Sequence, residues 1–426
     1  TLLASSAASD VYKRQICMEE VMSKFAVLGY GVVGSGVVEL FYKNKEKIEK
    51  KAGHEMDVKY ILDIREFPDS PYADKFVKSI DDIVGDSEIT AAAECMGGVE
   101  PAFTFTKECL SRGISVSTSN KELVAAKGDE LLKLAKENNC NYYFEASVGG
   151  AIPIIRPLHR CLAANDITEV AGILNGTTNF ILTKMIVDGM KFDDALKLAQ
   201  DLGYAERNPA ADVEGHDACR KICIISSLVY GKHVYPESVY TKGITDVKLE
   251  DVQIVSKFGA IKLIARVKEL ENGKILPTVM PMIVPFDNLM SRVDDVFNAV
   301  MVYGDGIDKT MFYGRGAGKL PTASAVLADV IESVKHDRTV FSQMWNSVSD
   351  NSFVEDYRML EAKVYFRVET DSIEKISEIA GNAEFICEET NQTAFVTDVI
   401  TLKSAEEISA RFEANGINVV SVLPVL

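Results

Sequence analysis

The sequence predicts an α/β protein of several domains, which opens on a doubly wound parallel sheet, continues into an α+β domain and ends in a ferredoxin-like module. Its 426 residues exceed what one ordinary core accommodates, so two or three domains are expected. Short apolar runs alternate with helical stretches over residues 24–145, as in parallel sheets. The last part has the order βαββαβ, which is typical of ferredoxin-like folds.

The first domain is expected over residues 23–148. Its short apolar runs predict strands, and the longer segments between them predict helices. We expect strands at 25–28, 58–62, 90–94, 114–117 and 142–145, and helices at 33–50, 101–112 and 123–137, with a short helix beginning at 80–83.

A glycine-rich turn joins the first strand to the first helix. In the spacing G-x-G-x-x-G, the first glycine makes a tight turn, the second lets the backbone approach a pyrophosphate, and the third lets helix and strand pack. In this context the turn predicts a Rossmann domain that binds NAD or NADP; a purely structural glycine turn is the alternative. The residues expected to contact the cofactor are Gly29, Tyr30, Gly31, Val32, Val33 and Gly34.

The residue that holds the adenosine ribose is less clearly marked. Asp63 ends the second strand, later after the turn than the usual spacing of about 20 residues. Arg65 follows and could neutralise a 2′-phosphate. NAD and NADP therefore both stay open as cofactors.

Two further domains follow. Residues 149–320 predict the α+β domain, the helix at 322–335 is expected to return to the first domain within 321–340, and residues 358–426 predict the ferredoxin-like module. The α+β domain is expected to contain helices at 154–164, 179–188, 192–202 and 217–229, and strands at 169–174, 262–270, 275–285 and 300–304. In the module, strands are expected at 363–368, 383–387, 393–399 and 418–423, and helices at 373–380 and 405–415.

The composition limits the classes of partner that we expect for the protein. The net charge of −17 argues against nucleic acid and anionic membranes as main partners, and no apolar run reaches the ~20 residues of a membrane span. Eight scattered cysteines without a secretory signal favour reduced thiols in a cytoplasmic protein. Cys219 and Cys223 could share a metal, but core packing is the default interpretation. Residues 1–22 lack a pattern, and we expect them to be a disordered, non-native leader.

Four polar residues cluster in the segment 199–221, namely Glu206, Asp212, Asp217 and Lys221. Asp217 and Lys221 are four residues apart and so share a helical face. On an exposed helix, such a pair would be ordinary surface decoration. This helix is otherwise apolar, so a partly buried lysine tuned for acid–base catalysis is the competing interpretation.

Four stretches carry a resemblance to a known family. They are Thr118-Ser119-Asn120-Lys121, residues 144–153, residues 172–179 with Asn175-Gly176-Thr177-Thr178-Asn179, and the segment 199–221. Together they resemble monofunctional homoserine dehydrogenases, over nearly the whole chain from Lys24. The resemblance implies NAD(P)-dependent interconversion of L-aspartate 4-semialdehyde and L-homoserine, on the route to threonine and methionine.

The resemblance also implies roles for individual residues. Lys221 is then the proton donor and acceptor, Lys121 lies by the nicotinamide, and Asp217 holds a substrate or lysine contact. Glu206 is expected to bind the substrate's amino group. Further substrate contacts are expected from Gly176, Thr177, Asp212 and Tyr204, and further cofactor contacts from Met96 and Gly316.

A sodium site is implied by the loop of Glu145, with the backbone carbonyls of Val148, Gly150 and Ile152; hard oxygen ligands suit such a cation. No zinc is required. For His216 the family mechanism assigns no chemistry.

The C-terminal module resembles an ACT domain, which implies threonine as a possible effector, and the family implies a homodimer or homotetramer. The first strand–helix turn of the module, residues 369–373, lacks the glycine at which such modules bind effectors. A sensing module and a purely structural one both stay open.

Two other functions fit the sequence less well. An amino-acid sensor built on an inactive dehydrogenase is disfavoured because Lys121, Glu206, Asp217 and Lys221 are all present. A phosphorylating semialdehyde dehydrogenase would need a cysteine nucleophile with a histidine partner, which the sequence does not arrange.

Overall fold

The computed structural model describes residues 22–336, 344–348, 350–389 and 391–426. Most of the predicted leader, residues 1–21, and the end of the expected returning helix segment lie outside the described residues. The chain divides into two compact units. Among the described residues, the first comprises 22–120, 131–144 and 322–336, and the second comprises 121–130, 145–321, 344–348, 350–389 and 391–426.

The first unit is built on a six-stranded parallel sheet with the order β3-β2-β1-β4-β5-β6. This is the strand order of the doubly wound dinucleotide-binding fold, so the predicted fold class is confirmed. The strands are β1 (Ser23–Leu28), β2 (Met56–Leu62), β3 (Phe76–Val77), β4 (Ile89–Glu94), β5 (Ser115–Thr118) and β6 (Tyr142–Tyr143). Strand β3 was not predicted from the sequence, and β6 is two residues shorter than the strand predicted at 142–145.

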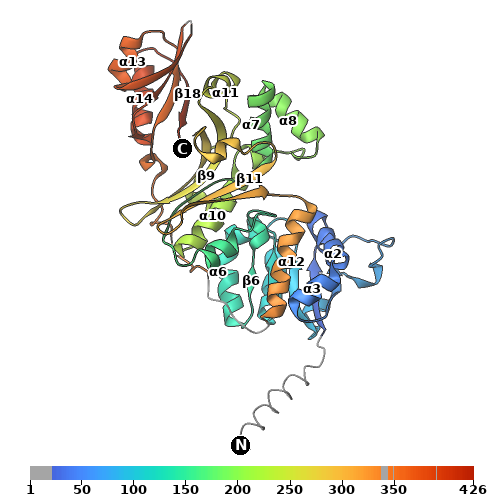
Figure 1. Cartoon of the computed structure of the whole chain (residues 1–426). Helices are drawn as coiled ribbons and strands as arrows, with labels where there is room; N and C mark the ends of the chain where they lie inside the picture. Colours follow the sequence, from blue (N-terminus) through green and yellow to red (C-terminus); the bar gives the residue numbers. More distant parts are fainter. Residues whose placement is uncertain (1–21, 337–343, 349, 390) are drawn as a thin grey trace, which may run out of the picture. The chain divides into compact units, whose positions relative to one another are not determined.

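Helices cover this sheet. The predicted helix at 33–50 is two helices, because the chain breaks at Asn44, whose backbone φ is −120°. Figure 1 shows α12 beside α2 and α3. The helices are α2 (Val32–Lys43), α3 (Lys45–Ala52), α4 (Asp81–Val84), α5 (Ala102–Ser111), α6 (Lys121–Glu137) and α12 (Lys319–Lys335), with the 3₁₀ turn η1 at Ala73–Lys75.

The second unit contains a sheet with the order β12-β11-β7-β9-β10-β8. Its strands are β7 (Ile167–Ile173), β8 (Tyr240–Thr241), β9 (Gly259–Glu269), β10 (Ile275–Pro285), β11 (Phe297–Gly304) and β12 (Asp308–Arg315). Its helices are α7 (Gly176–Asp188), α8 (Phe192–Asp201), α9 (Ala210–Val213), α10 (His216–Tyr230) and α11 (Leu249–Val255). Short turns are η2 (Glu145–Ser147), η4 (Pro236–Ser238) and η5 (Leu289–Arg292).

The expected helix at 154–164 is mostly not α-helix. A single π-helical turn, Pro157–Cys161, occupies its centre. Pro157 stands at its start, and the side chain of Glu145 accepts the backbone N–H groups of Ile154 and Ile155. Long-range capping, which is invisible in the local pattern, therefore shapes this segment.

The C-terminal module has a four-stranded antiparallel sheet with the order β15-β16-β14-β18. This order matches the predicted ferredoxin-like topology. The elements are β14 (Val364–Val368), α13 (Ile373–Ala380), β15 (Ala383–Glu389), β16 (Gln392–Thr397), α14 (Leu402–Ala414) and β18 (Val419–Pro424), preceded by η6 (Tyr357–Met359) and by β13 (Glu361–Ala362), which pairs with β17 (Ile400–Thr401).

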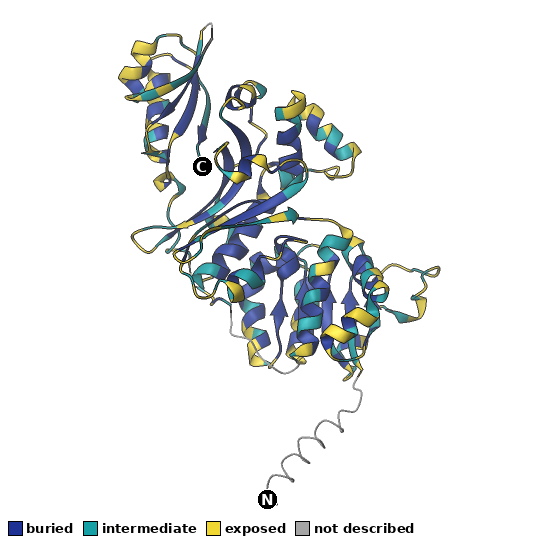
Figure 2. Ribbon diagram, in the orientation of Figure 1, coloured by how far each residue is buried: buried dark blue, intermediate teal, exposed yellow. Residues whose placement is uncertain are grey.

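The module shares one hydrophobic core with the sheet of the second unit. Buried Met282 and Val284 of β10 belong to the same cluster as Phe366 and Phe412 of the module. Figure 2 shows the inner strands of both sheets mostly buried, whereas β12 and the outer helix faces are largely exposed or intermediate. None of the helices in the described part of the chain is long and apolar enough to span a membrane.

Candidate active site

The glycine turn has the geometry that a bound pyrophosphate requires. Gly29 adopts a φ of +91°, which favours glycine, and its N–H donates to Leu62 at 2.8 Å. A Cβ at position 34 would lie 1.8 Å from the Gly29 carbonyl oxygen, so only glycine fits there. A Cβ at Gly31 would meet nothing within 4 Å, and no side chain caps the N-terminus of α2. The turn therefore leaves open space beside uncapped N–H groups, which suit a phosphate.

Asp63, at the end of β2, holds this turn in place. Its buried carboxylate accepts the N–H of Tyr30 at 2.8 Å and the backbone N–H of Arg65 at 2.9 Å. The Arg65 guanidinium adds a bidentate pair at 3.0 and 2.8 Å. These hydrogen bonds lower the pKa of Asp63 below its usual range. The Arg65 side chain is itself 57% exposed.

A second polar chain connects the carboxyl ends of β4 and β5. The fully buried Glu94 accepts the N–H of Met96 at 2.6 Å and the hydroxyl of Thr118. The Thr118 hydroxyl in turn accepts the N–H of Asn120 at 2.9 Å, and the Asn120 side chain donates to the carbonyl of Gly98 at 2.6 Å. Burial raises the pKa of Glu94 to about 7. In such sheets ligands bind outside the carboxyl ends of the strands, so this chain shapes the expected cofactor crevice.

The second unit brings two lysines onto one buried carboxylate. Asp217, in the first turn of α10, lies 3.0 Å from Lys121 Nζ through one oxygen and 2.7 Å from Lys221 Nζ through the other. Lys221 also donates to the carbonyl of Leu174 at 2.7 Å. The side chains of Asp217 and Lys221 are only 7% and 8% exposed. The surface-pair interpretation is therefore wrong, since the pair is buried.

Burial and charge separate the proton affinities of the two lysines. Burial lowers the pKa of Lys221, although Asp217 acts in the opposite direction. The charge of Asp217 raises the pKa of Lys121. Burial alone would raise the pKa of Asp217, but the two lysines and their hydrogen bonds bring it below its usual range. Lys221 is thus the more easily deprotonated ammonium, and Lys121 keeps its proton to higher pH.

Asn175 organises this cluster, and the sequence analysis assigned it no role of its own. Its amide nitrogen donates to Asp212 at 2.7 Å and to Asp217 at 2.9 Å. Its oxygen caps α7 by accepting the N–H of Thr178 at 2.8 Å. A polar residue before a helix at the end of an apolar strand is an N-cap signal, which could have identified it.

The expected substrate contacts lie partly beside this cluster. The Thr177 hydroxyl donates to the carbonyl of Tyr204 at 2.8 Å, and burial together with Asp217 raises the pKa of Asp212. Glu206, by contrast, is exposed, and its recorded hydrogen bond is through its backbone carbonyl, from Gln200 at 3.2 Å. No described contact joins the Glu206 carboxylate to the lysine cluster.

Asn298 of β11 is a second residue that the sequence analysis missed. It is 2% exposed, and its side-chain oxygen has no hydrogen-bond partner among the described residues. A Cβ at Gly316 would lie 2.1 Å from its amide nitrogen, and one at Gly176 would lie 3.4 Å from its oxygen. Asn298 therefore lies between two glycines expected to contact ligands. A single amide in an otherwise apolar strand is the signal that could have found it.

The loop expected to hold sodium is well ordered by hydrogen bonds. Both carboxylate oxygens of Glu145 are engaged, by the N–H groups of Ile154, Ile155 and Arg156 at 2.6 to 2.9 Å. No described residue donates to the carbonyl oxygens that we expect as ligands, which belong to Val148, Gly150 and Ile152.

Side-chain metal ligands do not cluster in the described part of the chain. In the described ranges no three His, Cys, Asp or Glu residues are placed to hold a metal ion. Cys219 and Cys223 are buried in α10. His216 is exposed and pairs with Glu214 at 3.2 Å, away from any lysine contact.

Comparisons with known proteins agree with this geometry. Residues 153–331 match the profile of the homoserine dehydrogenase family, and residues 29–145 match that of the homoserine dehydrogenase NAD-binding domain. A homoserine dehydrogenase of Lactococcus lactis is 38% identical over 352 residues, which are 81% of this chain and 82% of the relative.

Solved structures are similar as well. A homoserine dehydrogenase from Thiobacillus denitrificans has a TM-score of 0.86 at 33% identity, covering 95% of this chain and 97% of that one. A hyperthermophilic archaeal homoserine dehydrogenase in complex with NADPH has a TM-score of 0.63 at 29% identity, covering 73% of this chain and 97% of that one. On these matches, the chain belongs to the homoserine dehydrogenase family and is an NAD(P)-binding oxidoreductase.

Proposed function

We propose that this chain interconverts L-homoserine and L-aspartate 4-semialdehyde, with Lys221 as the proton donor and acceptor. The observation that carries the proposal is the buried Asp217 between two lysines of different proton affinity. A bound nicotinamide supplies or accepts the hydride in this chemistry. The remaining task of the protein is to move one proton and to stabilise charge on the reacting oxygen.

Lys221 is suited to proton transfer for a physical reason. A desolvated lysine has a lowered pKa, so its neutral form is accessible nearer to physiological pH. In homoserine oxidation the neutral amine takes the proton of the hydroxyl, and in aldehyde reduction the ammonium returns it. Its hydrogen bonds to Leu174 and Asp217 fix the direction of the remaining N–H.

Lys121 takes a different role. Its pKa is raised by Asp217, so it stays charged and stabilises negative charge that develops on the substrate oxygen. Asp217 orients both lysines, and Asn175 orients Asp217. The arrangement separates a proton-transferring cation from a purely electrostatic one.

Substrate recognition is proposed for the groups around α7. The substrate's ammonium needs a carboxylate, for which Glu206 and Asp212 are the candidates. Thr177 and Gly176 begin α7, where uncompensated N–H groups favour a carboxylate. The exposed position of Glu206 supports an entry role, in which the side chain meets the substrate from solvent.

NADP is the cofactor that we propose. Each oxygen of Asp63 already accepts two N–H groups, so little acceptor capacity is left for a ribose hydroxyl. The exposed guanidinium of Arg65 instead offers donors to a 2′-phosphate. The NADPH complex of the archaeal relative supports this preference.

A monovalent cation, sodium, is proposed for the loop after η2. Three backbone carbonyls without described donors support it, at Val148, Gly150 and Ile152. The engaged carboxylate of Glu145 supports a role in holding this loop. Replacement of sodium by choline is expected to lower turnover, and unchanged turnover would remove the cation from the proposal.

Regulation and assembly are proposed on the family resemblance. We propose threonine as an effector of the C-terminal module and a homodimer or homotetramer as the assembly. The edge strand β12 is exposed over much of its length, which supports a contact between copies. Rates unchanged by millimolar threonine would favour a structural module, and sedimentation would report the assembly.

One assay tests the proposed function. Purified protein is incubated with L-homoserine and either NADP or NAD, and nicotinamide reduction is followed by absorbance. We expect reduction that depends on homoserine and is faster with NADP. Folded protein without activity toward either cofactor would overturn the enzyme assignment and favour a sensor.

A further inference from the structure

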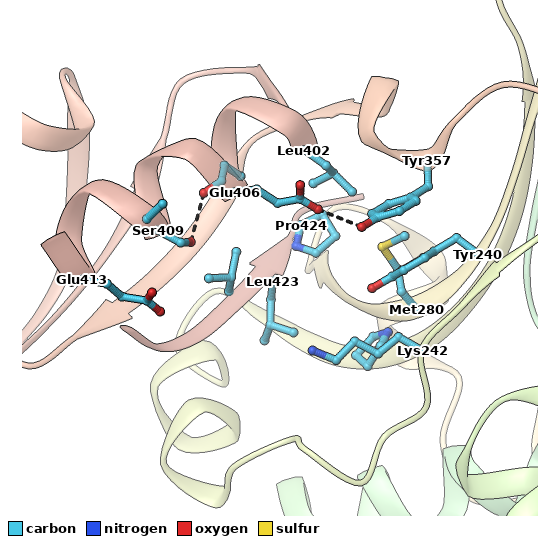
Figure 3. A pocket seen from close by; sticks show the side chains of 14 residues that line it. Tyr240, Lys242, Met280, Tyr357, Leu402, Glu406, Ser409, Glu413, Leu423 and Pro424 are labelled. Carbon is cyan, nitrogen blue, oxygen red and sulfur yellow. Dashed lines mark hydrogen bonds between the residues drawn. The ribbon is translucent and has the colours of Figure 1, made fainter. Parts of the chain in front are cut away.

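A cavity of about 410 Å³ lies between α14 of the C-terminal module and the β8–β10 edge of the second sheet. Its volume is within the range of small-molecule sites, about 300–1,000 Å³. Apolar side chains such as Met280 and Leu402 form much of the wall. Figure 3 shows Glu406 and Glu413 on α14, with Tyr240 and Tyr357 at one end. None of the residues that line the cavity belongs to the Asp217 cluster.

The charged groups of the cavity favour a cation. Glu406 and Glu413 are seven residues apart, so both lie on the same face of α14. One oxygen of Glu406 accepts the Tyr357 hydroxyl at 2.7 Å. Lys242, the lining residue of opposite charge, is within 4.0 Å of Asp246 and is thereby partly compensated. Both glutamates are exposed residues, so two solvent-accessible carboxylates and an aromatic pair border an apolar space.

The two tyrosines strengthen this character. Their rings stack with centroids 3.7 Å apart and an interplanar angle of 15°. The hydrogen bond to Glu406 raises the pKa of Tyr357 to about 12, as expected beside a carboxylate. Aromatic faces beside carboxylates attract ammonium groups.

A short segment connects the cavity with the catalytic cluster. Tyr240 and Lys242 line the cavity, and the Lys242 N–H donates to Val279 at 2.8 Å. Two residues later, the N–H of Ile244 donates to the carbonyl of Val213 at 2.8 Å. Val213 directly follows Asp212, which Asn175 holds in the cluster.

Tight packing makes this connection stiff. A Cβ at Gly243 would lie 2.0 Å from the Val213 carbonyl oxygen, so the two backbones are in direct contact. A Cβ at Gly215, the residue before α10, would lie 3.1 Å from the Thr241 methyl group. Residues 240–244 are therefore packed directly against the loop that leads into Asp217 and Lys221.

We propose that this cavity binds a small organic cation, a primary amine with an apolar body, and that residues 240–244 transmit its binding to the Asp217 cluster. The apolar walls take the body and the glutamates of α14 take the ammonium group. This ligand class differs from a carboxylate or neutral compound of the same size, which the two glutamates would repel or leave unpaired.

The binding test uses three probes with the same six-carbon body: n-hexylammonium, hexanoate and hexan-1-ol. Titration calorimetry on the full chain is expected to give saturable binding of hexylammonium, about tenfold or more tighter than hexanoate, because only the ammonium forms charge-assisted hydrogen bonds. Glu406→Gln and Glu413→Gln are each expected to weaken the amine.

Glu407→Gln is the matched control. It removes the same charge from a neighbouring position of α14 that is exposed, as Glu406 is, but does not line the cavity, so hexylammonium affinity is expected to stay unchanged. Absence of saturable binding, equal affinity for hexanoate, or equal weakening in the control would each overturn the cation site. If a second copy of the chain fills the cavity instead, hexylammonium would show no saturable binding.

Transmission is tested by homoserine oxidation over the same amine concentrations. We expect a saturable change of kcat or KM with the midpoint of the binding curve, which is lost in Glu406→Gln. Binding without any change in rate would overturn the transmission. Failure of the proposed enzyme function is distinguishable, because it would appear before amine is added, while calorimetry reports binding regardless of activity.

Discussion

Asp63 in the first unit and Asp217 in the second are both buried carboxylates. In each of them, both oxygens are engaged by N–H donors. At Asp63 three of four donors come from Arg65, and the fourth is the N–H of the glycine turn. At Asp217 the donors are two lysines and the amide of Asn175. Both carboxylates have a lowered pKa.

The two carboxylates differ in the kind of cation that pairs with them. A guanidinium does not lose its proton in proteins, so the role we propose for the Asp63 pair is to shape the turn and recognise a ligand. A lysine changes its pKa readily when buried, so the Asp217 pair can move a proton. Similar carboxylate geometry therefore supports a binding site in one unit and acid–base chemistry in the other.

The largest effect is expected from Lys221→Ala. Without the proton donor and acceptor, turnover should fall about 10²–10⁴-fold, the usual contribution of general acid–base catalysis. NADPH binding, followed by its fluorescence, should persist. Lys197→Ala is the matched control, because Lys197 also pairs with an aspartate four residues away on the same helix but is exposed. Turnover near that of the wild type in Lys221→Ala would remove Lys221 from proton transfer.

Asp217→Asn is expected to follow, with a loss of about 10²-fold, since misplaced catalytic groups cost about this much. Because Asp217 raises the pKa of Lys221, its loss should lower that pKa further. Homoserine oxidation needs neutral Lys221, so its rise with pH should move to lower pH. Asp201→Asn, at the exposed pair, should leave the profile in place. A shift to higher pH would contradict the assignment.

Arg65→Ala tests the other carboxylate. The ratio of kcat/KM for NADP to that for NAD should fall by about tenfold or more, the value of one charge-assisted hydrogen bond. Arg358→Ala is the control, because Arg358 makes the same bidentate pair with an aspartate two residues before it. If the ratio stays constant in Arg65→Ala, the arginine does not read the 2′-phosphate.

The smallest effect is expected from Asn175→Ala. Loss of the N-cap should lower the free energy of unfolding by about 1 kcal/mol. Ser372→Ala, which removes the cap of α13, should cost a similar amount but leave kcat unchanged. Asn175→Ala should also lower kcat, since Asp212 and Asp217 lose their shared donor. If kcat is the same in both variants, Asn175 acts only as the N-cap of α7.

Much of the fold could be predicted from the local sequence pattern. The parallel, doubly wound sheet of the first domain and the βαββαβ tail were predicted from apolar runs and the glycine turn, because the alternation of elements along the chain is set by neighbouring residues. The break at Asn44 and the edge strand β12 did not follow. The first lies in a charged segment of good helix formers, and the second alternates too weakly in burial to stand out.

The site was predictable in type but not in arrangement. The i, i+4 spacing put Asp217 and Lys221 on one face, yet their burial depends on the surrounding tertiary fold. Lys121 reaches Asp217 across almost 100 residues of sequence, which no spacing rule reveals. The surroundings of the Asn298 side-chain oxygen, which has no hydrogen-bond partner among the described residues, depend on how Gly176 and Gly316 pack beside it.

The most direct test measures the ionisation of Lys221 itself. In protein labelled with ¹³C-lysine, the side-chain resonances are followed by NMR over pH, and the signal missing from Lys221→Ala identifies the residue. We expect this one lysine to titrate below the ordinary value of about 10.4, together with the rise in homoserine oxidation. Titration of Lys221 at the ordinary value, or a rate profile that does not follow it, would contradict its role in proton transfer.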